Sequence, residues 1–125
     1  MLSDRVAKAR KIAEFGLINH INKNAWLVPG TNGKKYLVTR RARSLRFRCD
    51  LDLGGHGLRD CKGNAHNGTL CYHCLAAIIA LSQENGKQVA FCNNEKDAER
   101  LSHLGGSLYK VSSGQGRGQV WIVVK

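Results

Sequence analysis

The sequence predicts an α+β fold, and three observations support this prediction. Two segments have the periodicity of helices, one amphipathic near the N-terminus and one almost wholly apolar over residues 71–83. Several short runs rich in Val, Ile, Leu and aromatic residues, bounded by Gly and Asn, are typical of strands. Between them, residues 49–70 lack periodicity, and so long an irregular segment is uncommon in a small domain unless something else organises it.

The N-terminal half predicts one helix followed by a three-stranded β-meander. The helix covers residues 4–15, and Gly16 is expected to end it. Its apolar stripe consists of Val6, Ala9, Ile12 and Ala13. The turn GTNGK separates the last two of the three expected strands. These strands are LINHIN (17–22), AWLVP (25–29) and KYLVTR (35–40).

The C-terminal residues predict a β-α-β-β extension. QVAFC (88–92) is a buried strand, and Asn93 or Asn94 caps a short helix. Gly105 and Gly106 end this helix, and the strands SLYKV and QVWIVV pair as a hairpin. The residues expected to face inward from the helix are Ala98, Leu101 and Leu104. We therefore expect two parts, residues 1–86 and residues 87–125, with the second packed on the first.

Positive charge is concentrated in the first part of the chain. The net charge is +11, and residues 1–48 carry twelve Lys or Arg against two Asp or Glu. Such an asymmetry is the electrostatic footprint expected for binding a polyanion. In the segment RRARSLRFR (40–48), extended geometry would place Arg46 and Arg48 on one face and Leu45 and Phe47 on the other. Candidate phosphate contacts are Lys34, Lys35, Arg40, Arg41, Arg43, Arg46, Arg48 and, in the loop SGQGRG, Arg117.

Cysteine and histidine side chains predict a metal site at the irregular segment. Cys49, Cys61, Cys71 and His73 follow the spacing C-x11-C-x9-C-x-H. Three thiolates and one imidazole are a complete tetrahedral set for one structural zinc ion, which would organise this segment. Five cysteines without a visible signal peptide also favour thiols or metal ligands over disulfides.

The segment CYHCLAAIIAL resembles the SWIM-type zinc finger, whose pattern is C-x-C, a variable spacer and C-x-H opening a hydrophobic helix. The resemblance covers about residues 10–83, because the upstream strands are similar to those of transposase-associated members. It implies a small zinc module that binds DNA or protein. The pattern is broken at Phe47, which stands where the first cysteine would be, so Cys61 is expected to supply the missing ligand. His56, His66 and Cys74 are its alternatives.

We therefore expect a zinc-binding, SWIM-like protein that binds nucleic acid, with DNA favoured, as an accessory factor of a mobile element or virus. The alternative is a protein-interaction module that docks an acidic partner through the same basic face. An enzyme is not expected, because Asp50, Asp52 and Asp60 match no acid pair and four protein ligands close a zinc site. No membrane-spanning or secretory segment is visible, so a cytoplasmic location is expected.

Overall fold

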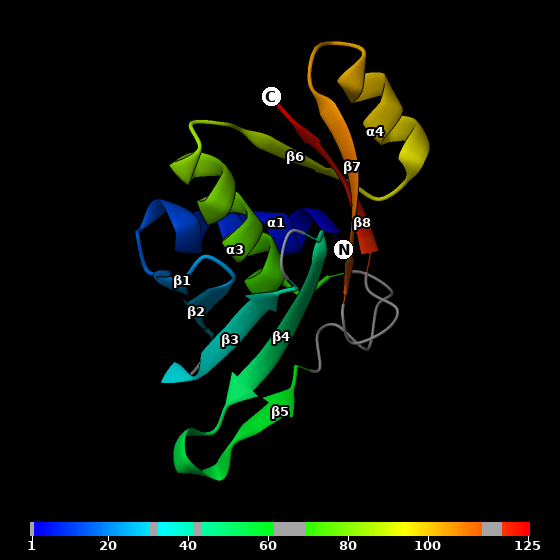
Figure 1. Cartoon of the computed structure of the whole chain (residues 1–125). Coiled ribbons are helices and arrows are strands. Elements are labelled where there is room, and N and C mark those ends of the chain that lie inside the picture. Colours follow the sequence, from blue (N-terminus) through cyan, green and yellow to red (C-terminus); the bar gives the residue numbers. More distant parts are fainter. Residues whose placement is uncertain (1, 31–32, 42–43, 62–69, 114–118) are drawn as a thin grey trace.

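The computed structural model describes residues 2–30, 33–41, 44–61, 70–113 and 119–125. In these residues, three α-helices accompany a sheet of eight strands, which confirms the α+β class (Figure 1). The helices are α1 (Leu2–Glu14), α3 (Tyr72–Glu84) and α4 (Glu95–Ser102), and a 3-10 turn, η2, covers Gly54–His56.

The strands of the described residues form a single mixed sheet in the order β1-β2-β3-β4-β7-β8-β6, with β5 attached to β4. The first four run antiparallel to one another, as does the set β7, β8 and β6. The strand bounds are β1 Asn19–Asn22, β2 Ala25–Pro29, β3 Lys35–Arg40, β4 Arg46–Asp52, β5 Leu58–Asp60, β6 Val89–Cys92, β7 Ser107–Ser113 and β8 Gln119–Val124.

Strand β4 is the branch point of the sheet. One edge pairs with β3 along the strand, and the other edge is divided between β7 and β5. Its first residues pair in parallel with the end of β7, Arg46 with Ser112 and Phe47 with Ser113. Its last residues pair in antiparallel with β5. β4 therefore holds together the N-terminal strands, the C-terminal strands and the irregular segment of the sequence.

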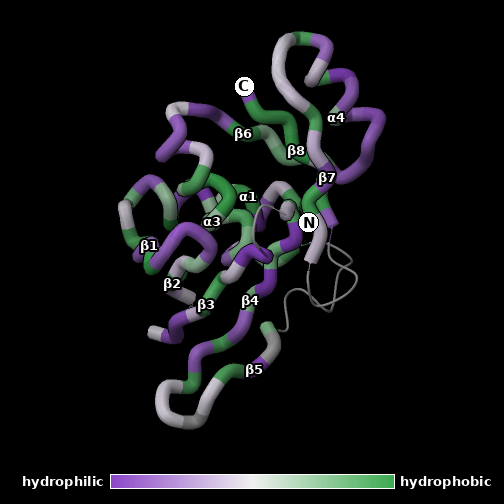
Figure 2. Tube along the Cα trace, in the orientation of Figure 1, coloured by the Kyte–Doolittle hydropathy of each residue, from purple (hydrophilic) through white to green (hydrophobic). Residues whose placement is uncertain are grey.

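Helix α3 forms the centre of the core. Every residue from His73 to Ile79 is buried, because the helix packs against α1 and against strands β2, β3 and β4. Trp26 and Phe47 face it from the sheet and are fully buried, with ring centroids 6.0 Å apart. Figure 2 shows the hydrophobic character of α3 and β8 beside the largely hydrophilic α4.

Three sequence-based expectations require correction. Residues 49–60 are not structureless: they contain the end of β4, the turn η2 and β5. Leu104 does not face inward; it is 75% exposed because α4 ends at Ser102. Leu45 precedes β4 and is partly exposed, so the expected alternation holds only from Arg46 onward.

The C-terminal β-α-β-β order is confirmed by β6, α4, β7 and β8. These strands do not form a sheet of their own, because the pairing of β7 with β4 makes them part of the larger one. A division of the chain at residue 86 stays a prediction. Among the described residues, no helix has the length and apolar character that crossing a membrane requires.

The packing predicts a large stability loss for Phe47→Ala. Phe47 is 1% exposed, and removing a buried phenyl ring leaves a cavity, so the free energy of unfolding should fall by about 3–5 kcal/mol. Chemical denaturation measures this loss. Phe15→Ala is the matched control, because the Phe15 side chain is 70% exposed and its removal should change stability by less than about 0.5 kcal/mol. Equal stability of the two variants would contradict the core placement.

Candidate metal centre

The hairpin of β4 and β5 places Cys49 and Cys61 side by side. Asp50 pairs with Asp60, and continuing this antiparallel register brings Cys61 opposite Cys49. The backbone N–H of Cys61 donates to the carbonyl of Cys49 at 3.1 Å. Gly54, with φ of 66°, lies in the turn that reverses the chain, a conformation that glycine adopts without strain. Local pairing therefore positions two thiols that are twelve residues apart.

The N-terminus of α3 supplies the other two side chains. Cys71 is the N-cap residue, with extended backbone angles, and His73 lies in the first helical turn. The apolar residues that follow fix this end of α3 against the sheet, because they are buried between α1 and β2–β4. The unpaired N–H groups of a helix N-terminus also favour negative charge on a thiolate there.

The four side chains converge at one buried point. One possible ligand atom from each of Cys49, Cys61, Cys71 and His73 lies within 4.8 Å of the others. Cys61 Sγ is 3.7 Å from His73 Nδ1. A sulfur and a nitrogen bound to one tetrahedral metal ion are about 3.5 Å apart, given ordinary zinc bond lengths. The arrangement could therefore hold a metal ion after only small movements.

Hydrogen bonds couple the ionisation of the thiols and the imidazole. Hydrogen bonds with the thiols of Cys61 and Cys71, together with burial, raise the pKa of Cys49. Burial raises the pKa of Cys71, but hydrogen bonds from Cys49 and Cys61 outweigh it and lower this pKa to about 7. Burial lowers the pKa of His73, but its hydrogen bonds with Cys61 and Cys71 leave it raised. A divalent cation would stabilise the deprotonated thiols, which are the form that binds a metal ion.

The His73 ring is clamped by its neighbours. It stacks on Tyr36 with ring centroids 3.7 Å apart, and the ring centroid of Tyr72, the preceding residue, lies 4.0 Å from its own. Gly30 passes so close that an added Cβ would collide with the Tyr36 ring and lie 3.3 Å from His73 Nε2. Nε2 is buried and has no hydrogen-bond partner among the described residues. Ring packing and the hydrogen bond to Cys61 therefore together orient the ring with Nδ1 toward that thiol.

The alternative ligands lie in different positions. Cys74 is fully buried and its thiol interacts with those of Cys49 and Cys71, but it is not one of the four convergent groups. His66 lies outside the described residues, as does the side chain of His56. Cys92 is a buried core residue that packs with Ala98 and Val123, away from the tetrad.

The predicted phosphate contacts that the structure describes lie at the start of β3 and where β3 ends and β4 begins. Lys34 and Lys35 are exposed at the start of β3. Arg40 is half-buried: its guanidinium donates to Asn24 Oδ1 at 3.2 Å and lies over the Trp26 ring. Three others gather where β3 ends and β4 begins, namely Arg41, Arg46 and Arg48. Arg43 and Arg117 lie outside the described residues.

The β4–β5 hairpin, which builds half of the site, is not among the elements expected from the sequence. A signal was present: Leu51 and Leu53 precede, and Leu58 follows, a turn segment of Gly54, Gly55 and Gly57. Apolar residues alternating on both sides of a glycine-rich turn indicate a hairpin.

No family model matches the chain, and neither a curated protein nor a solved structure matches it.

Replacing one of the four convergent side chains should abolish metal binding and unfold the segments around the site. Cys71→Ser should yield protein that binds no metal and loses the structure of β4, β5 and the start of α3, because a structural metal ion in a site of this type contributes on the order of 10 kcal/mol. Elemental analysis and circular dichroism of the purified variant measure both effects. Cys92→Ala is the matched control and should retain the metal, as should Cys74→Ala. Full metal content in Cys71→Ser would contradict the assignment.

Proposed function

We propose that the tetrad holds one structural zinc ion and that the chain is a SWIM-like protein that binds nucleic acid, DNA above all. The observation that carries the zinc proposal is the convergence of Cys49, Cys61, Cys71 and His73. Sulfur ligands favour zinc over magnesium or calcium, which take oxygen. When bound, zinc would supply a cross-link between the sheet and α3, and four protein ligands would leave no open position for catalysis.

Binding of nucleic acid is supported by the arginines where β3 meets β4. The backbone N–H of Arg41 donates to the carbonyl of Arg46 at 3.3 Å, so the two residues are cross-strand neighbours. Arg46 and Arg48 lie on the outer face of β4, opposite the face that buries Phe47 and Cys49. In the described residues neither Arg41 nor Arg46 forms an ion pair. Both guanidinium groups are exposed and can reach phosphates.

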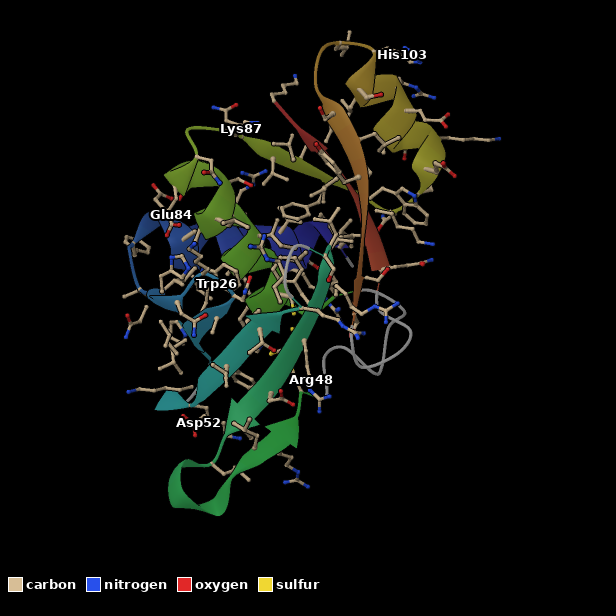
Figure 3. All side chains as sticks on the ribbon, in the orientation of Figure 1. Trp26, Arg48, Asp52, Glu84, Lys87 and His103 are labelled. Atoms are coloured by element: carbon tan, nitrogen blue, oxygen red, sulfur yellow. The ribbon has the colours of Figure 1, made fainter. Side chains whose placement is uncertain are left out.

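Acidic residues limit this surface toward the other end of β4. Arg48 Nε lies 3.0 Å from an oxygen of the buried Asp50, and Lys35 is the cross-strand partner of Asp52. Figure 3 labels Arg48 and Asp52 along the same strand. Arg41 and Arg46 therefore carry charge without an ion-pair partner in the described residues, near the start of the strand that bears Cys49. Zinc would hold this strand, and phosphate contacts would carry affinity without reading base sequence.

A protein-interaction module is the second candidate, and a separate observation favours it. Phe15, Leu17 and Ile21 are exposed where α1 passes into β1, with 70%, 56% and 49% of each residue accessible. β1 is an edge strand of the sheet, and all four of its residues are exposed. An apolar corner beside an open strand edge is a feature of protein-binding surfaces.

Salt titrations test the nucleic-acid proposal. For Arg41→Ala/Arg46→Ala, affinity for a labelled DNA duplex should fall for every sequence tried. The plot of log K against log salt should flatten by roughly one unit for each lost phosphate contact. Fluorescence anisotropy at several salt concentrations measures both quantities. Zinc content should not change, because neither arginine is a ligand.

The matched control is Lys96→Ala/Arg100→Ala, which removes the same charge from exposed positions on α4. It should leave most of the affinity and slope intact. If the two double variants have equal affinities and slopes, the arginines do not contact phosphate. If the wild-type chain binds no nucleic acid even at low salt, the protein-interaction candidate takes precedence.

A further inference from the structure

A cleft separate from the metal centre lies at the other end of α3. It has a volume of about 390 Å³, is open to solvent and is bordered by α1, the last turn of α3 and β6 with the end of β8. The tetrad lies at the first turn of α3, so the length of the helix separates the two sites. Polar and charged residues form much of its wall: Arg10, Ser82, Gln83, Lys87, Gln88 and Lys125.

Three cations from distant parts of the sequence meet at this cleft. Arg10 comes from α1, Lys87 from the turn before β6, and Lys125 follows β8. Lys125 is held at the wall by two backbone hydrogen bonds with Gln88, of 2.9 and 3.3 Å. No Asp or Glu is among the described lining residues. Figure 3 shows Lys87 at the turn after α3, far along the molecule from Arg48.

These cations are not required to cap α3. The carbonyls of Ser82 and Gln83 already accept from backbone N–H groups of the following turn, at 2.9 to 3.1 Å. In the described residues, neither Lys87 nor Lys125 forms an ion pair. Arg10 donates from Nη2 to the carbonyl of Val89 at 3.0 Å, which fixes the guanidinium at the wall and leaves its other donors for a ligand.

We propose that this cleft binds a phosphate group. A phosphate accepts several charge-assisted hydrogen bonds at once, and the lining residues Arg10, Lys87 and Lys125 carry groups that can donate them. Ser82, Gln83 and Gln88 offer neutral polar groups around it. The volume lies within the range of small-molecule sites, so the cleft has room for a phosphate ester. Its source is either the backbone of a bound nucleic acid or a free phosphorylated molecule.

Two probes distinguish these sources with the full-length chain. Inorganic tripolyphosphate, titrated by calorimetry, reports a site for free phosphates. A labelled DNA duplex, titrated at several salt concentrations, reports contacts to backbone phosphates. The test variant is Lys87→Ala/Lys125→Ala, whose positions are exposed, and the control of equal charge is Lys96→Ala/Arg100→Ala on α4. Thermal melting checks that both variants fold.

The cleft variant should bind tripolyphosphate at least roughly tenfold more weakly than the control variant if free phosphates are the source. If nucleic acid is the source, the slope of log K against log salt for DNA binding should be flatter for the cleft variant than for the control variant, by roughly one unit for each lost phosphate contact. Equal behaviour of both variants with both probes would overturn the proposal. This test does not depend on Arg41 and Arg46. If the wild-type chain binds no DNA but the cleft variant loses tripolyphosphate affinity, the cleft proposal is upheld and the nucleic-acid function is rejected.

Discussion

The burial of three thiols and an imidazole at one point constrains the whole N-terminal part of the structure. Cys49 and Cys61 reach this point through a hairpin, and Cys71 and His73 reach it through the first turn of α3. Burying charged thiolates is unfavourable unless a partner neutralises them, and a divalent cation bound by them does so directly. The same four residues join the sheet to its central helix, so the charge balance of the site and the position of α3 depend on each other.

Strand β4 carries this constraint to the rest of the molecule. Its inner face presents Cys49 to the tetrad and Phe47 to the core, while its outer face presents Arg46 and Arg48 to solvent. Its far edge joins β7, which connects the C-terminal strands to the same sheet. A metal ion that fixes Cys49 would therefore fix the arginine-bearing surface as well. The cleft at the end of α3 lies beyond this direct influence. Arg10 is held there by its hydrogen bond to the carbonyl of Val89, and Lys125 by its backbone hydrogen bonds with Gln88.

Much of this arrangement could be predicted from local sequence patterns. The apolar run after Cys71 predicts α3, and alternation predicts β2, β3 and the C-terminal hairpin. The four convergent side chains were also predicted, because their types and spacing form a complete ligand set. The parallel pairing of β4 with β7 could not be predicted, since it joins residues more than sixty positions apart through two residue pairs. Leu104 was misplaced because a helical pattern does not reveal that α4 ends two residues earlier.

Hydrogen exchange with and without a zinc chelator, on protein whose metal content is known from native mass spectrometry, tests the central claim most directly. We predict one zinc ion per chain. Chelation should release protection of amides in β4, β5 and the first turn of α3, because these elements depend on the ligand set. Amides in β7 and β8 should lose less protection. A chain that is isolated without metal, and whose exchange is the same with and without the chelator, would contradict the account.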